Sequence, residues 1–343
     1  MSEETTKAPG LKYSVQDRSI LLPHYKRFLV EPTLPFIPAR VNPNTITHGG
    51  PLLNLGALLL LCWADRFDRG WLFFAVALLV HVYLWCDNAD GSHARRTNQC
   101  SAKGEFLDHG LDLLNATYIA CMTVVCLGAP PFWSVTAAVV VPAAAAVTYW
   151  EQAETGVFEL GLLNQIESIC CLSVALIARG VFGIETIRGV VWSGFSLPIL
   201  ILMFVTAVAL FGIFRSAWRV SKKSGRIGPF VAPFAFGAMV TVVAATQALS
   251  TVAAIIAGAV VFIFLGVRQL TLRVRGQRPF VERGVLIAAV ILALIVAYRV
   301  SGGAVPQSSL DWAAATMISL AFGSLALWRA VEGHREVERI DRR

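Results

Sequence analysis

Long apolar segments, separated by short polar links, follow one another along most of the chain. A helix of about 20 residues crosses a bilayer, and segments of this length predict ten membrane-spanning helices. The seventh and eighth are divided only by a short polar stretch, so one long kinked helix is the alternative there. We expect an all-α, polytopic integral membrane protein. The approximate ranges of the ten helices are 46–64, 71–94, 104–127, 131–150, 160–182, 191–214, 228–247, 249–268, 283–300 and 310–331.

The first 45 residues have a different pattern. They are too polar and too rich in proline for a signal peptide. Between Tyr13 and Arg40, aromatic and aliphatic residues alternate with basic ones, which is typical of an amphipathic segment lying along a membrane surface. A disordered arm is the alternative. We therefore expect an interfacial arm at 1–45, a transmembrane catalytic domain at 46–331 and a cytoplasmic tail at 332–343.

Composition agrees with a membrane protein and gives it an orientation. Of the 343 residues, 56% are hydrophobic and only 15% are charged. Most Lys and Arg residues fall in loops on the side that holds both termini, which is expected to be cytoplasmic. The net charge of +7 is therefore attributed to contact with anionic lipid and not with nucleic acid. The preference for Arg over Lys and the many alanines favour a bacterial inner membrane over an endoplasmic reticulum. Basic residues expected on the other side are Arg66, Arg69, Arg179, Arg188 and Arg299.

Four aspartates stand at facing ends of the second and third predicted helices. Asp87 and Asp90 are spaced i,i+3, and Asp108 and Asp112 are spaced i,i+4, so each pair projects from one face of its helix. The link between the two helices is short, which makes them antiparallel neighbours and brings the pairs together. Carboxylates at such a place are costly unless a cation neutralises them.

The residue types around the aspartates indicate which cation and which ligand to expect. Carboxylate oxygens without His or Cys favour Mg²⁺, Mn²⁺ or Ca²⁺. Four carboxylates fit two divalent ions better than one, and a pair of metal ions can clamp a reacting phosphate. Gly91 and Gly104 would let a phosphate approach the backbone closely. Arg95 can reach a pyrophosphate with its planar guanidinium.

The motif D-x2-D-G-x2-A-R-x8-G-x3-D-x3-D, which runs from Asp87 to Asp112, resembles the signature of the CDP-alcohol phosphotransferase family at every fixed position. The surrounding residues are most similar to the choline and ethanolamine phosphotransferase branch. The resemblance implies two Mg²⁺ or Mn²⁺ ions. Asp87, Asp90 and Asp108 would hold one ion, and Asp87, Asp108 and Asp112 the other.

The same resemblance implies roles for the neighbouring residues. Gly91, Ala94, Arg95 and Gly104 would bind the CDP and its pyrophosphate. Asp112 is also the candidate catalytic base, because a carboxylate beside a metal can deprotonate a hydroxyl. A homodimer is implied as well.

Histidine 109 has two possible roles. As His109 follows the third aspartate of the motif, it is a second catalytic candidate, since histidine titrates near neutrality. The alternative is a hydrogen-bonded residue between helices.

Two further stretches resemble the same branch. One begins at Trp150 and reads W-E-x3-T-G-x3-L-G-x2-N, which implies that Glu151 and Asn164 line a substrate entrance. The other contains Asn44, which is assigned to the same entrance. Glu167 is either functional or a polar residue lining a helix, because it stands one residue earlier than the resemblance leads us to expect.

These features predict an enzyme of phospholipid synthesis. It would transfer phosphocholine or phosphoethanolamine from a CDP-alcohol to diacylglycerol and release CMP. The alternative within the family is phosphatidyl transfer from CDP-diacylglycerol to a small polar alcohol or an inositol phosphate. A cation-coupled transporter is the non-enzyme alternative, but its sites lie near the midplane between repeated halves, and no repeat is visible here.

Overall fold

The computed structural model of the chain describes residues 14–161 and 164–342. Ten helices in these ranges are long and apolar enough to cross a membrane. The expected polytopic, mainly helical fold is therefore confirmed. The helices fall into two compact units, one built from the residues up to Leu127, Gly156–Trp192 and the residues from His334, the other from Gly128–Thr155 and Ser193–Gly333.

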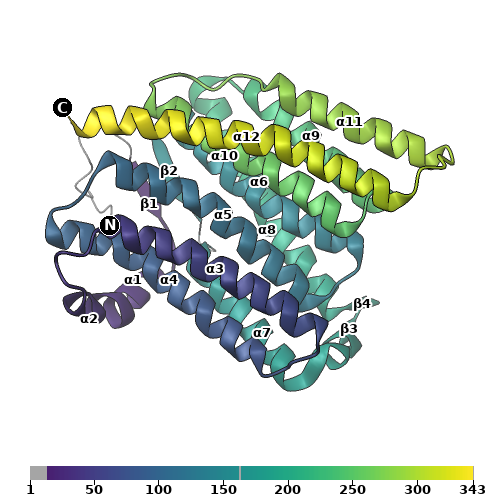
Figure 1. Cartoon of the computed structure of the whole chain (residues 1–343), viewed down its shortest axis with the longest axis horizontal. Helices are drawn as coiled ribbons and strands as arrows, with labels where there is room; N and C mark the ends of the chain where they lie inside the picture. Colours follow the sequence, from purple (N-terminus) through teal and green to yellow (C-terminus); the bar gives the residue numbers. More distant parts are fainter. Residues whose placement is uncertain (1–13, 162–163, 343) are drawn as a thin grey trace. The chain divides into compact units, whose positions relative to one another are not determined.

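The first unit is a cluster of four long helices (Figure 1). Helix α3 (Pro43–Arg66) packs against α4 (Leu72–Thr97) and α5 (Ala102–Leu127), and α7 (Gln165–Gly189) packs against α4 and α5. Their shared core is apolar and includes Leu61, Val80, Leu84, Met122 and Ile169.

At the C-terminal end of α3, one arginine links three of these helices through polar contacts. Arg179 of α7 forms an ion pair with Asp65 at the end of α3. It also donates hydrogen bonds of 2.7 and 2.6 Å to the carbonyl oxygens of Val125 and Cys126, in the last turn of α5. Its guanidinium lies 5.0 Å from the ring centroid of Phe73. This arginine is buried, so these contacts supply the partners that a charge in an apolar unit requires.

The N-terminal arm is tied to the same unit. It contains a strand and four short helical segments, and the strand pairs in parallel with β2 (Val157–Leu160). Glu167 of α7 anchors the turn that follows the strand, because its Oε1 accepts hydrogen bonds from the Ser19 hydroxyl at 2.7 Å and from two backbone amides at 3.0 Å. Tyr13, where the amphipathic pattern was predicted to begin, lies outside the described residues. The segments are β1 (Ser14–Asp17), α1 (Leu22–Tyr25), η1 (Lys26–Val30), α2 (Glu31–Thr33) and η2 (Leu34–Phe36).

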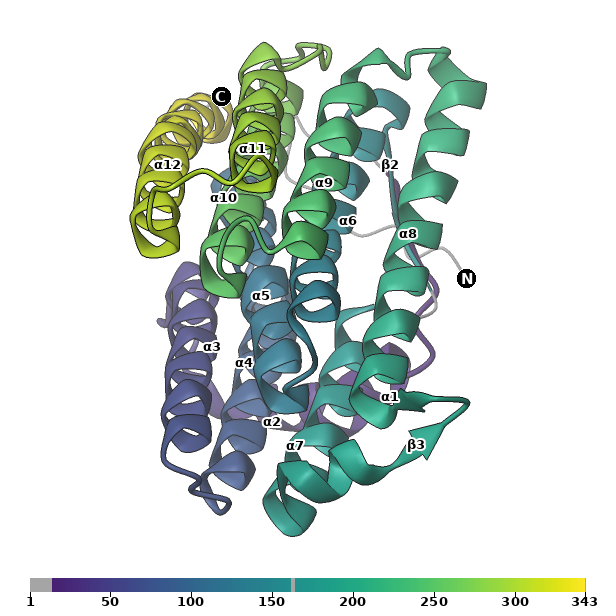
Figure 2. The ribbon, with the colours of Figure 1, turned by 90° about the vertical axis from the view of Figure 1, so that its right-hand side faces the viewer.

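The second unit consists of helices and one short strand, β4 (Phe195–Ser196). Helix α6 (Pro131–Thr155) packs against α8 (Leu197–Ser224), α9 (Gly228–Thr246) and α10 (Thr251–Val274), and α11 (Arg283–Val300) packs against α9. Figure 2 shows α8, α9 and α11 along this unit. The two-residue strands β3 (Val191–Trp192) and β4 (Phe195–Ser196) precede α8 in the chain. The last helix is α12 (Gln307–Asp341), whose final turns are grouped with the first unit.

The seventh and eighth spanning segments are separate helices. Gln247 ends α9 in a left-handed conformation, with φ of 50°. Ser250 begins α10 as an N-cap whose hydroxyl accepts a hydrogen bond from the Ala253 amide at 3.3 Å. The single kinked helix considered from the sequence is therefore excluded.

The helices that carry the aspartates are longer than predicted. Helix α4 continues to Thr97, where the left-handed residue Asn98, with φ of 55°, closes it by returning its amide to the carbonyl oxygens of Ala94 and Arg95. Helix α5 already begins at Ala102, and its first two amides donate to the carboxylate of Asp341 at 2.8 and 3.0 Å. Only four residues, 98–101, link the helices, so they are antiparallel neighbours as expected.

Candidate active site

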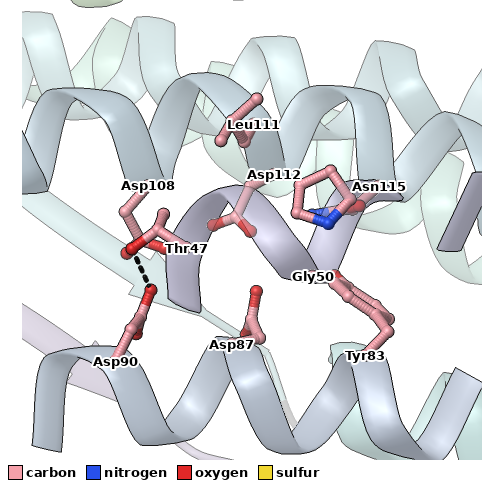
Figure 3. Close-up of a pocket in the computed structure, with 10 residues that line it drawn as sticks. Thr47, Gly50, Tyr83, Asp87, Asp90, Asp108, Leu111, Asp112 and Asn115 are labelled. Atoms are coloured by element: carbon pink, nitrogen blue, oxygen red, sulfur yellow. Dashed lines mark hydrogen bonds between the residues drawn. The ribbon is translucent and has the colours of Figure 1, made fainter. Parts of the chain in front are cut away.

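Three carboxylates converge between α4 and α5. One side-chain oxygen from each of Asp87, Asp108 and Asp112 lies within 4.8 Å of the other two. Figure 3 shows Asp87 projecting from α4 toward the two aspartates on α5. The spacing along each helix and the short link between the helices together produce this arrangement.

Asp90 lies in the same pocket but outside this close group. It is buried, and its Oδ2 accepts a hydrogen bond of 2.6 Å from the hydroxyl of Thr47 on α3 (Figure 3). Its Oδ1 accepts from the Gly91 amide at 2.5 Å. Thr47 therefore orients this carboxylate from a third helix, and the pattern within the motif gave no signal for it.

The pocket is shared by α3, α4 and α5. Beside the four aspartates, the residues that line it are Thr47, Gly50, Pro51, Tyr83, Leu111 and Asn115. Gly50 of α3 allows close helix packing here, because an added Cβ would meet the ring of Tyr83 at 3.3 Å. The acids are thus enclosed by helices and are not displayed on an open surface.

The donor set fits a divalent cation of the hard type. Asp112 has one buried carboxylate oxygen, Oδ1, without a hydrogen-bond partner in the described chain. An orphaned, buried carboxylate oxygen beside two further carboxylates is an arrangement that a cation would satisfy. The ligands are all oxygens, which suits Mg²⁺ or Mn²⁺. Asp87, Asp108 and Asp112 are the residues of the structure that would hold such an ion together.

Two polar side chains, Tyr83 and Gln165, lie near Asp87. The amide of Gln165, at the start of α7, donates a hydrogen bond of 2.5 Å to the hydroxyl of Tyr83. Both side chains lie beside the Asp87 carboxylate. Tyr25 of α1 lies near this acid. The pKa of the Tyr25 hydroxyl is raised, mainly by burial and also by the charge of Asp87. All three were missed from the sequence, because they reach the site from other segments.

The predicted nucleotide-binding residues lie around the ends of α4 and α5 that flank the 98–101 link. An added Cβ at Gly91 would lie 3.4 Å from the guanidinium of Arg95, which is exposed. At Gly104, the added atom would meet the side chain of Asn44 at 3.1 Å. Ala94 is buried one turn after Asp90. Binding of CDP by these residues stays a prediction.

His109 is not among the residues that line the pocket. It is only 8% exposed, and its ring centroid lies 5.2 Å from that of Phe158 on β2. The hydrogen-bonded role between helices, which was the alternative from the sequence, also stays a prediction. Its catalytic role stays a prediction.

Two of the three polar residues assigned to a substrate entrance, Glu151 and Asn164, have structural partners. Glu151 is buried in the second unit and forms an ion pair with Arg219 of α8, with a contact of 2.6 Å to its Nη2. Asn164 is the N-cap of α7, in a capping box with Glu167, and its amide donates to Asp17 at 3.0 Å. The entrance itself stays a prediction.

Comparisons with known proteins agree with the motif. Residues 40–193 match the family model described as CDP-alcohol phosphatidyltransferase. Cholinephosphotransferase 1 of Danio rerio is 34% identical over 165 residues, which are 46% of this chain and 42% of the relative. Cholinephosphotransferase 1 of Xenopus laevis is 31% identical over 193 residues, or 54% and 47%. Residues 40–193 are therefore similar to the CDP-alcohol phosphatidyltransferase family, and the expected resemblance to this family and its choline branch is confirmed.

The match has limits in extent and source. The chain covers a little under half the length of these relatives. A third relative, of Dictyostelium discoideum, is 30% identical over 52% of this chain and 45% of its own, and is described as an uncharacterized class-I family protein. These relatives are from animals and a slime mould, so they lend no support to the predicted bacterial inner membrane. A multi-pass membrane protein is supported.

Proposed function

We propose that this protein transfers a phospho-alcohol from a CDP-alcohol to the hydroxyl of a lipid, with release of CMP. The convergence of Asp87, Asp108 and Asp112 on one small volume carries this proposal. Charge develops on phosphate oxygens during such a transfer, and a cation held by carboxylates neutralises it. Cholinephosphotransferases among the relatives favour phosphocholine as the transferred group and diacylglycerol as the acceptor.

The residues of the chain would divide the work among them. Asp87, Asp90, Asp108 and Asp112 would hold Mg²⁺ or Mn²⁺. When bound, the metal would neutralise charge on the pyrophosphate and orient it. Residues Gly91, Ala94, Arg95 and Gly104 would bind the CDP part.

Asp112 would accept the proton of the lipid hydroxyl. The hydroxyl oxygen forms a bond to the phosphorus that carries the alcohol, and the bond from that phosphorus to the CMP oxygen breaks. CMP leaves with the electron pair of that bond. The pocket would open to the cytoplasm, which agrees with the distribution of basic residues.

A second candidate follows from the description of the matching family, which names phosphatidyl transfer. The donor would then be CDP-diacylglycerol and the acceptor a small polar alcohol. The same carboxylates and the same proton transfer would serve both reactions, so the choice rests on the substrates alone.

The test is to incubate the purified protein with CDP-choline, CDP-ethanolamine or CDP-diacylglycerol, each with its matching acceptor, and to measure CMP and lipid product. We expect divalent-metal-dependent CMP release with a CDP-alcohol and diacylglycerol. Asp108→Asn should abolish it. Asp68→Asn is the matched control, because Asp68 is an exposed acid outside the pocket, and asparagine suits its positive φ of 49°. Absence of CMP release from every donor would refute the proposal.

A further inference from the structure

A pair of asparagines lies one helical turn deeper in the unit than the acids. Asn115 follows Asp112 by three residues on α5, and Asn54 follows Gly50 by four residues on α3. The two side chains are 2% and 0% exposed, respectively. The Nδ2 of Asn54 donates a hydrogen bond of 3.2 Å to the Oδ1 of Asn115. The proposed function assigns no role to either residue.

The hydrogen bonding of this pair is incomplete. The Oδ1 of Asn54 is buried and has no partner in the described part of the chain. An unsatisfied buried acceptor costs about 1–3 kcal/mol, so simple helix-to-helix pairing leaves this atom unexplained. Asn115 also lines the pocket, and Figure 3 shows it one turn along α5 from Asp112. One member of the pair, Asn115, therefore faces the pocket, and the other, Asn54, has a hydrogen-bond acceptor without a partner.

The atoms that remain define the chemistry of a ligand. The Oδ1 of Asn115 faces Asn54, which leaves the Nδ2 group of Asn115 as a donor for the pocket. The Oδ1 of Asn54 remains as an acceptor. A phosphate oxygen would satisfy only the donor, and an ammonium group would satisfy only the acceptor. A hydroxyl satisfies both, because it accepts one hydrogen bond and donates another.

The surroundings indicate what kind of molecule carries this hydroxyl. One turn beyond Asn54 on the same helix stand Ala57, in the apolar core of the unit, and Leu58, which is partly buried and packs against that core. A hydroxyl on an apolar molecule would suit this environment better than a strongly hydrated head group. Water offers the same hydrogen bonds, so the experiment must separate the two sources.

We propose that Asn54 and Asn115 form the binding site for the hydroxyl of the lipid acceptor. This inference rests on the proposed function and adds to it the group that positions the nucleophile. Asn115 would contact the hydroxyl oxygen directly, one turn from the carboxylate of Asp112. The Oδ1 of Asn54 would accept a hydrogen bond from the hydroxyl until Asp112 takes the proton, and the Nδ2 group of Asn54 holds Asn115 in the orientation required.

The test uses the double variant Asn54→Leu/Asn115→Leu in mixed micelles. Replacing both partners by apolar residues leaves no stranded donor, so the fold should tolerate it. Loss of two hydrogen bonds of about 1 kcal/mol each predicts a rise in KM for diacylglycerol of about 10-fold or more. The KM for the CDP-alcohol should stay within about twofold of that of the wild type. Thr117→Val is the control, since this buried hydroxyl donates only within α5, to Leu113.

Three other outcomes are decisive. An unchanged KM for diacylglycerol would overturn the inference, because the pair would then be structural only. A fall in CMP release without lipid, with no change in the lipid KM, would assign the pair to water and overturn it too. If wild-type protein releases no CMP at all, the proposed function fails first.

Should the double variant not fold, the single variant Asn115→Ser decides. A raised lipid KM with a nearly unchanged Tm supports the inference, and an unchanged KM refutes it.

Discussion

Asp112→Asn is predicted to stabilise the metal-free protein while it abolishes activity. With the three carboxylate oxygens within 4.8 Å of one another, each pair of negative charges repels by roughly 3.5 kcal/mol at an effective dielectric constant of about 20. Three pairs sum to about 10 kcal/mol, which is comparable with the whole stability of a typical domain. Asp112 takes part in two of the pairs. Its replacement removes about 7 kcal/mol of repulsion as an upper bound, since bound protons relieve part of it in the wild type.

The assay is thermal unfolding in detergent, with EDTA or with Mg²⁺ or Mn²⁺. In EDTA, the variant should melt at a higher temperature than the wild type. Metal at 100 times its Kd should stabilise the wild type by about 2.7 kcal/mol. The variant should show a smaller shift, because it offers one charged ligand fewer.

Asp68→Asn serves again as the control and should behave as the wild type under both conditions. If Asp112→Asn melts below the wild type in EDTA and keeps the full metal shift, the carboxylates do not share a cation. The electrostatic reasoning for the site would then be refuted.

Three further predictions concern the support of the site. Arg179→Met should lower the unfolding free energy by about 2–3 kcal/mol, since it strands a carboxylate and two carbonyl oxygens, and an unchanged Tm would contradict this. Gly180→Val should lower the Tm because an added Cβ would lie 2.9 Å from the carbonyl oxygen of Gly70, whereas Gly56→Ala, with nothing within 4 Å, should not. Asp341→Ala should cost about 0.5–2 kcal/mol by uncapping α5, and equal amide exchange in its first turn before and after would disprove it.

The sequence predicted what depends on local periodicity. Apolar length gave the ten helices, and the i,i+3 and i,i+4 spacing placed the aspartates on facing surfaces. The C-terminal extension of α12 was missed because its composition is polar. Pairs such as Glu336 with Arg339, at 3.0 Å, support this largely polar part of the helix.

Contacts between distant segments were not predictable in this way. Asp90 lies outside the close group of the other three acids and accepts a hydrogen bond from Thr47 on α3. The motif contains no information about which face α3 turns toward the acids. Glu167 was left open between two roles, and the structure shows it accepting hydrogen bonds from the turn after β1, nearly 150 residues away. Side-chain pairing across such separations follows from tertiary packing alone.

The position of Arg179 has a consequence for how the first unit responds to a loss of cation. The ends of α3 and α5 near Asp65 and Cys126 are fixed by this guanidinium, whereas their opposite ends approach the mutually repelling acids. Chelation should therefore separate α4 from α5 most at the level of the acids, between the covalent 98–101 link and the contacts of the arginine. Spin labels on the two helices at that level would move apart, while labels beside the arginine would keep their separation.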